Sequence, residues 1–152
     1  MNYNIRKVTL EDIPIIWKMG KDVPFFETAE DIITFWPESV LNDCVDKEDV
    51  LFLVMEVENK ILGFIIGNIN NSLKKCEVEN IFIVPEYRKQ GYARILLKDL
   101  IQQLRTRGIE NICAMSEGSV VDFYKKNNFT KGNQFYWMDL ALSDRFKKEV
   151  NK

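Results

Sequence analysis

The hydrophobic and polar positions of this chain follow two periodicities, which predict the segments that form strands and those that form helices. Two-residue alternation and short apolar runs are typical of strands, and they occur at residues 3–8, 50–57, 61–68, 77–84, 111–115 and 135–142. Helical spacing of apolar residues predicts helices over 10–20, 28–36, 37–44, 92–107 and 120–127. The order of these segments predicts an α/β fold, with a mixed sheet of six to seven strands and helices on both faces.

Local signals set the ends of several helices. Residues Thr9–Asp12 have the form of a capping box at the start of the first helix. Thr28 is the expected cap of the second helical region, which Pro37 interrupts. Asn127 and Asn128 end the last helix, since asparagine tolerates the left-handed backbone that is usual there.

Length and composition indicate a single globular domain. The chain has 152 residues, of which 46% are hydrophobic and 29% charged, so it can bury a substantial core. We expect this domain over residues 1–142 and a charged, frayed tail over 143–152. The three cysteines, Cys44, Cys76 and Cys113, are odd in number and unpaired in spacing, which favours a reducing, cytoplasmic location.

The charge pattern argues against several function classes. The net charge is −2 with no basic run, so nucleic-acid binding is not expected. No apolar stretch is long enough to cross a membrane, and the first residues do not resemble a signal peptide. Histidine is absent, which removes the commonest zinc ligand and the commonest general base. We therefore expect no metal, and any base must be a carboxylate, tyrosine, cysteine or water chain.

A strand, a turn and a helix between residues 76 and 107 carry the main chemical signal. The strand stops at Pro85, and Gly91 lies in the turn just before the helix. The first amides of a helix lack intrahelical acceptors and lie at the positive end of its dipole. A glycine there lets a phosphate approach the bare backbone, and Arg88, Lys89 and Arg94 would add positive charge. An ordinary strand-to-helix turn is the alternative.

Two motifs in this region and beyond it resemble those of a known family. The sequence Ile83-x-Pro85-x-x-Arg88-x-x-Gly91-x-Ala93 resembles the acyl-CoA signature of the GNAT superfamily of N-acetyltransferases. A second match, Phe123-Tyr124-x-x-x-Asn128-Phe129, falls where the family's later motif is expected. The resemblance covers residues 3–142. It implies a sheet whose central strands splay apart, acetyl-CoA as co-substrate, and direct attack by a primary amine in a ternary complex.

The same resemblance implies which residues contact acetyl-CoA. The main chain of the central strand would pair with the pantetheine arm, and the motif's arginine and the loop after it would hold the pyrophosphate. The strand positions also suit a simple buried strand, and both interpretations can hold together because main-chain contacts leave the side chains free to pack. The residues implied are Ile81, Phe82, Ile83, Arg88, Lys89, Gln90, Gly91, Tyr92, Ala93 and Arg94.

Two carboxylates and one tyrosine are candidates for the catalytic roles. Freeing the lone pair of a lysine-like amine at pH 7 costs about 4.6 kcal/mol, since its reference pKa is near 10.4, so a base is needed. Glu77 and Glu79 on the central strand are the candidates, with solvated edge carboxylates as the alternative. In a flat strand they would share a face with Ile81 and Ile83, unless a bulge separates them. The resemblance assigns Tyr124 to protonating the departing thiolate; packing in the helix is its alternative.

The acceptor site is the least defined part. The family's substrate loop corresponds to the region around Phe25, Phe26, Glu27 and Trp36, although these aromatics also suit a core. Candidate acceptors are a protein N-terminus or lysine and a small amine, and a homodimer is possible. Glu117 stands where many family members have a cofactor-contacting asparagine. It motivates the alternative of a non-catalytic acyl-CoA-binding sensor or scaffold.

Overall fold

The chain forms a mixed five-stranded sheet in the part that the structure describes, with strand order β1-β2-β3-β4-β5. This computed structural model describes residues 2–26, 30, 32–116, 118–134, 136 and 138–148. Neighbouring strands are antiparallel except for β4 and β5, which run parallel. The predicted α/β class is confirmed, although six to seven strands were expected. The strands are β1 (Tyr3–Lys7), β2 (Val50–Val57), β3 (Lys60–Asn70), β4 (Lys75–Ile83) and β5 (Asn111–Ala114).

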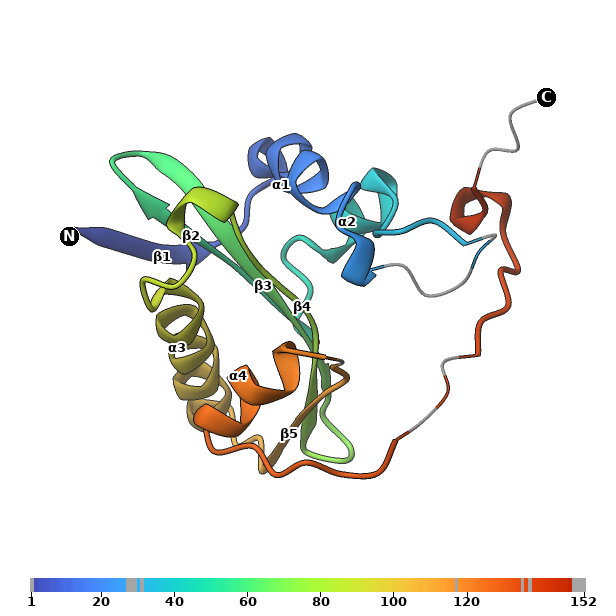
Figure 1. The fold of residues 1–152 in the computed structure, drawn as a ribbon. Coiled ribbons are helices and arrows are strands. Elements are labelled where there is room, and N and C mark those ends of the chain that lie inside the picture. The colour runs from blue at the N-terminus through green and yellow to red at the C-terminus, as the bar shows by residue number, and fades with distance from the viewer. Residues whose placement is uncertain are drawn as a thin grey trace.

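Helices cover both faces of the sheet, as the sequence predicts (Figure 1). One face carries α1 (Ile13–Gly20) and α2 (Glu38–Cys44), and the other carries α3 (Tyr92–Thr106) and α4 (Val120–Lys126). Single 3-10 turns add to them: η1 (Leu10–Asp12), η2 (Pro24–Phe26), η3 (Pro85–Tyr87) and η4 (Asp144–Phe146).

The two faces of the sheet have separate hydrophobic cores. The α3 side is mainly aliphatic and centres on fully buried leucines such as Leu96, Leu97 and Leu100. The α1 side contains a pile of aromatic rings, in which Phe64 packs on Phe82 with 5.8 Å between ring centroids. Side chains therefore pack β4 into the protein from both faces, so its main-chain edge is not needed for packing.

The central strands separate partway along their length. β4 pairs with β5 only from Lys75 opposite Asn111 to Val78 opposite Ala114. Beyond Val78, the edge of β4 that faces β5 has no strand partner among the described residues. This is the splay that the family resemblance implies, and it leaves part of the main chain of residues 79–83 available for a ligand.

The helix expected over residues 28–36 is wrong for the residues described there. Ile32 instead forms an antiparallel bridge with Lys147, and the Ile33 amide donates to the Phe146 carbonyl (3.0 Å). Main-chain groups that a helix would use locally are therefore bonded to a segment more than 100 residues later. The expected cap, Thr28, lies outside the described residues.

The strand expected over residues 135–142 is also wrong for the residues described there. These residues run outside the sheet (Figure 1). Their alternating apolar side chains find no layer to pack on: Tyr136, Met138, Leu140 and Leu142 are 80–95% exposed. The alternation typical of a strand is present, but no neighbouring strand hydrogen-bonds to it, and this accounts for the lower strand count.

Residues 144–147, within the predicted frayed tail, contact the body of the protein. The turn η4 and Lys147 contact residues 32–36 through the bonds given above, and the Phe146 ring lies edge-on to Trp36 (6.5 Å). A boundary at residue 142 stays a prediction. Among the described residues, no helix combines the length and apolar character needed to cross a membrane.

Candidate active site

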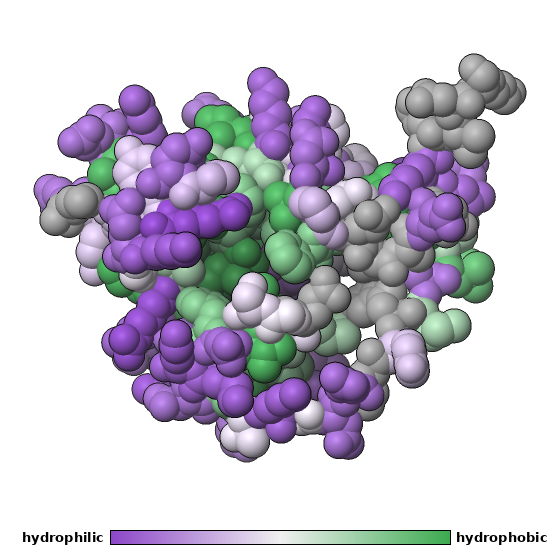
Figure 2. All heavy atoms as spheres, in the orientation of Figure 1, coloured by the Kyte–Doolittle hydropathy of each residue, from purple (hydrophilic) through white to green (hydrophobic). Residues whose placement is uncertain are grey.

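A large cavity opens where β4 and β5 separate. Its volume is about 2740 Å³, well above the 300–1,000 Å³ of an ordinary ligand pocket, so a cofactor and an acceptor fit together. Strand β4, the loop after β5, α4 and residues 23–36 all contribute to its lining. Figure 2 shows apolar surface gathered in the hollow between the α1/α2 half and the α3/α4 half, with hydrophilic residues around it.

The central strand suits a pantetheine arm. Ile81, Phe82 and Ile83 all line the cavity, while Phe82 and Ile83 are also buried core residues, 9% and 6% exposed. Their side chains thus serve the cores while the β5-side edge of the main chain remains without a strand partner among the described residues. The interpretation as a buried strand is confirmed for Phe82 and Ile83, whereas main-chain contact with a pantetheine arm stays a prediction that this geometry fits.

The turn before α3 has the conformation expected of a phosphate-binding loop. Gly91 is the N-cap of α3 with a left-handed backbone (φ +89°), and no side chain caps the helix. The first bond of the helical ladder runs from the Ile95 amide to the Gly91 carbonyl (3.1 Å), so the amides before Ile95 precede that ladder. A Cβ built on Gly91 would meet no atom within 4 Å. The helix start is therefore open, and it fits an anion such as a pyrophosphate.

The loop lies at the rim of the cavity. Arg88 and Arg94 line the cavity, whereas the residues between them, Lys89 to Ala93, are not among its lining residues. Arg94 and Lys98 lie one turn apart on the same face of α3, and both contribute to the lining. The extended strand and the basic helix start thus form one continuous path from the splay to the surface.

Arg88 has an additional contact that the sequence does not suggest. Its Nε donates to the Ile83 carbonyl (2.8 Å), and its guanidinium lies over the Phe82 ring (5.3 Å). The side chain therefore joins the loop to the end of β4. Contact with a phosphate through its remaining donors stays a prediction.

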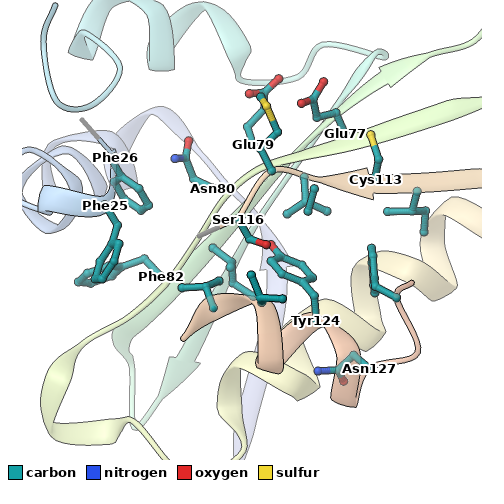
Figure 3. Close-up of a pocket in the computed structure, with 18 of the residues that line it drawn as sticks. Phe25, Phe26, Glu77, Glu79, Asn80, Phe82, Cys113, Ser116, Tyr124 and Asn127 are labelled. Atoms are coloured by element: carbon teal, nitrogen blue, oxygen red, sulfur yellow. The ribbon is translucent and has the colours of Figure 1, made fainter. Parts of the chain in front are cut away.

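A β-bulge decides where the candidate bases point. Opposite β3, Ile66 pairs with Asn80 and Gly67 pairs with Val78, so Glu79 is the extra residue on β4. The bulge separates Glu77 from Ile81 and Ile83, which a flat strand would place on its own face. Figure 3 shows Glu77 and Glu79 side by side, extending from the sheet away from Tyr124.

Glu79 has the electrostatic character expected of a general-base candidate. Its pKa is raised, first by burial and then by repulsion from Glu77, while a hydrogen bond from Asn68 Nδ2 (3.4 Å) opposes the shift. Neither Glu77 nor Glu79 forms an ion pair with any described residue. A half-buried carboxylate with a raised pKa accepts a proton more readily than an exposed one.

Tyr124 reaches the same cavity from the opposite face of the sheet. It is held on α4 by edge-to-face contacts with Phe123 (5.2 Å) and Phe129 (5.1 Å), and it is only 7% exposed. Burial raises its pKa to about 12, so the phenol keeps its proton at neutral pH and can donate it. Figure 3 shows its ring directed from α4 toward the gap between the strands, beside Ser116.

The expected acceptor residues divide into cavity wall and core. Phe25, Phe26 and Trp36 line the cavity, and Phe25 is 61% exposed. Phe35 also lines the cavity, although it is a core residue at 6% exposure. Glu27 and Glu117 lie outside the described residues.

Three polar or aromatic residues of the site are absent from the sequence prediction. Asn80 accepts a hydrogen bond from Trp36 Nε1 (2.7 Å), Asn68 donates to Glu79 (3.4 Å), and Phe146 packs on Trp36. Asn68 interrupts the apolar run of β3 and Asn80 directly precedes the apolar run at the end of β4, and this signal could have identified them. Nothing near Phe146 in the sequence indicates its partner.

The described residues contain no group of three or more histidine, cysteine or acidic side chains placed to hold a metal. Cys76 is buried, and Cys44 and Cys113 are half-buried, all as free thiols. Burial raises the pKa of Cys76 to about 12, which makes it a poor nucleophile. Cys113 lies opposite Glu77 in the sheet register and lines the cavity.

Comparisons with known proteins agree with this geometry. An uncharacterized N-acetyltransferase from Pyropia yezoensis is 29% identical over 93 residues, which are 61% of this chain and 49% of that protein. The chain thus spans about half the length of this relative. The fold of the present chain resembles that of the PaiA N-acetyltransferase from Thermoplasma acidophilum, solved with coenzyme A. The TM-score is 0.76 at 23% identity, and the match covers 90% of this chain and 95% of that one.

A second solved structure has the same fold. The ribosomal-protein-S18-alanine N-acetyltransferase from Escherichia coli superposes with a TM-score of 0.69 at 21% identity, covering 87% of this chain and 80% of that one. At these identities the structural likeness shows the fold alone. The acetyltransferase (GNAT) family itself matches residues 16–129, which is more than half of the chain. The chain therefore belongs to the acetyltransferase (GNAT) family.

Proposed function

We propose that this protein transfers an acetyl group from acetyl-CoA to a primary amine by direct attack in a ternary complex. One observation carries the proposal: the edge of β4 that has no strand partner among the described residues leads to a helix start without a side-chain cap, and Glu79 and Tyr124 line the same cavity on the other side. The acceptor is a small amine or the amine of a peptide or protein. Nucleic acid and membrane have no part in this reaction.

Binding of acetyl-CoA uses the main chain more than the side chains. The pantetheine arm takes the place of the missing strand partner along residues 79–83, and the diphosphate lies at the start of α3 near Gly91. Arg94 and Lys98 supply positive charge along this path. The cofactor's thioester is thereby placed in the gap between β4 and β5.

The two faces of the sheet then divide the proton transfers. Glu79 takes the proton of the ammonium on the α1/α2 side, and the neutral nitrogen attacks the thioester carbon from there. A carbon–nitrogen bond forms, the carbon–sulfur bond breaks, and Tyr124 gives its proton to the sulfur on the α4 side. The proton that the nitrogen loses as the amide forms restores the Tyr124 phenol through solvent, and Glu79 releases its own proton to solvent. Glu77 keeps the pKa of Glu79 raised by its negative charge.

A sensor or scaffold that binds acyl-CoA without turnover is the second candidate. The substitution of Glu117 for a cofactor-contacting asparagine favours it. A cytoplasmic location and a homodimer remain predictions.

Calorimetry with acetyl-CoA and thiol release with a panel of amines test the two candidates together. The transferase binds acetyl-CoA and releases free CoA only when an amine is present. Tight binding with no thiol release across the panel would favour the sensor. Failure to bind acetyl-CoA at about 1 mM, equivalent to less than about 4.1 kcal/mol of binding free energy, would exclude both.

A further inference from the structure

We infer that the acceptor is a monoamine with an aromatic or bulky apolar tail, in preference to a polycation. The inference rests on the proposed function, because it names the substrate class of the same cavity. It depends on how charge is distributed along the acceptor wall, which is the part of the cavity lining formed by the described residues of 23–36 and by residues 77–80 of β4. Figure 3 shows Phe25 and Phe26 at one end of this wall, Glu79 and Glu77 at the other, and Asn80 between them.

The carboxylate end is suited to one ammonium group. Glu77 and Glu79 lie side by side with no ion-pair partner among the described residues. A cation that enters here gains two charge-assisted interactions. Transfer of its proton to Glu79 then leaves the Glu77 charge beside the neutral nitrogen.

Among the described residues between 22 and 36, no charged side chain lines the other end of the wall. The described residues between 22 and 36 that line the cavity have uncharged side chains, and among them only Thr34 is polar; they are Val23, Phe25, Phe26, Ile32, Ile33, Thr34, Phe35 and Trp36. A second ammonium placed here would lose water and find no counter-ion on these residues, which is costly. An apolar tail that enters the same region has no charge to desolvate, so it does not incur this cost.

The polar group of the tryptophan is already bonded within the protein. Trp36 Nε1 donates to Asn80 Oδ1 (2.7 Å), and Phe146 fixes the ring from the side (6.5 Å). Trp36 therefore presents an apolar surface of fixed orientation, and it offers a ligand no hydrogen bond from Nε1 while that bond stands.

The phenyl ring of Phe25 is exposed to solvent and is available for contact with a ligand. It is 61% exposed, whereas Phe26 behind it stacks on Phe35 (5.3 Å) and meets the edge of Phe82 (6.5 Å). Phe25 is thus an exposed ring whose neighbour in the chain, Phe26, belongs to the packed aromatic pile. An aromatic tail packs on such a ring with favourable offset or edge-to-face geometry.

A comparison of three amines tests this inference. Phenethylamine, ethylamine and 1,4-diaminobutane all present an unhindered primary amine, so their tails are the main difference. We expect kcat/KM for phenethylamine to exceed each of the other two by about tenfold or more, the discrimination that an apolar pocket supplies. Equal values, or a preference for the diamine, would overturn the inference and leave the transferase in place.

A variant pair locates the effect. Phe25→Ala should reduce the phenethylamine-to-ethylamine ratio about tenfold, with acetyl-CoA affinity by calorimetry as the check that the cofactor site is intact. Leu10→Ala is the matched control, because Leu10 is also 61% exposed but does not line the cavity. An unchanged ratio in Phe25→Ala would overturn the role of the aromatic wall. Binding of acetyl-CoA without thiol release from any amine would overturn the transfer itself, and this inference with it.

Discussion

The cofactor side and the acceptor side of the cavity are built in different ways. The proposed cofactor side is one continuous segment, β4 to α3, in which side chains fill the cores and main-chain groups are left for the ligand. The acceptor side combines residues 23–36, the bulged face of β4 and the η4 turn, and it presents side chains. A site made from contiguous backbone can be recognised in a sequence, whereas one made from distant side chains depends on tertiary contacts that local patterns do not contain.

Tyr124 lies where the two sides meet, and its removal should have the largest effect. Tyr124→Phe keeps the ring contacts with Phe123 and Phe129 but deletes the proton donor. We expect kcat to fall by about 10²–10⁴, the range of general acid catalysis, with acetyl-CoA affinity changed less than about threefold, measured by steady-state kinetics and calorimetry. Tyr3→Phe on β1, 47% exposed and outside the cavity, is the control. Normal turnover in Tyr124→Phe would show that another group protonates the thiolate.

Glu79 tests the side-chain half of the comparison. Glu79→Gln should lower kcat about 100-fold, as expected for loss of a general base, whereas Glu77→Gln should have a smaller effect. Similar losses in both variants, or a larger loss in Glu77→Gln, would exchange the roles of the two carboxylates.

The pH dependence of kcat separates the two carboxylates more sharply. The pKa of Glu79 is raised, so it is protonated and inactive below that value, and activity should fall as the pH drops through a midpoint above the ordinary glutamate pKa near 4.3. Glu77→Gln removes a charge that raises this pKa, so the midpoint should move to lower pH. Asn68→Ala removes a hydrogen bond that lowers it, so the midpoint should move to higher pH. Shifts in the same direction would contradict the assignment of Glu79 as the base.

Gly91 tests the main-chain half. Its φ of +89° costs a non-glycine residue about 1–2 kcal/mol, so Gly91→Ala should distort the helix start and weaken acetyl-CoA binding about tenfold, which corresponds to 1.4 kcal/mol. Gly108→Ala is the matched control, because Gly108 has a φ of +75° and equal free space at the far end of α3. Calorimetry should show lower affinity in the first variant alone. Equal affinity in both would mean that the phosphates bind elsewhere.

Replacement of Phe146 should have the smallest effect of these variants, and it should change acceptor binding without changing acetyl-CoA binding. Phe146→Ala removes the edge contact that orients Trp36, so we expect the acceptor KM to rise about threefold, a loss below 1 kcal/mol, with no change in acetyl-CoA affinity. An equal change in both would show that the η4 turn supports the whole cavity.

The success of the sequence prediction follows the same division. The five observed strands, the helices α1 to α4 and the left-handed backbone at Asn128 are predicted, because each depends on local spacing and turn chemistry. Residues 28–36 and 135–142 are mispredicted where the structure describes them, since their apolar spacing suits a helix and a strand. In the fold, the backbone of Ile32 and Ile33 bonds instead to a distant segment, and residues 136–142 meet no strand.

Within the site, the sequence indicates which residues take part better than it indicates where their side chains point. It identifies Glu77 and Glu79, but parity alone places them on the same face as Ile81, and only the bulge at Glu79 separates them. It also identifies Trp36, but the bond to Asn80 that fixes the ring joins residues 44 positions apart. Such pairings arise when the sheet assembles, so no window of sequence contains them.

The central claim is that the acetyl group passes directly from a main-chain-bound thioester to the amine. Rapid-quench mass spectrometry with isotope-labelled acetyl-CoA follows the label most directly. Direct transfer predicts that labelled amine and free CoA form in equal amounts, that neither forms without amine, and that no label is found on the protein. Label on Cys113, the cavity thiol opposite Glu77, ahead of labelled amine would contradict direct transfer, as would bound acetyl-CoA that never yields labelled amine.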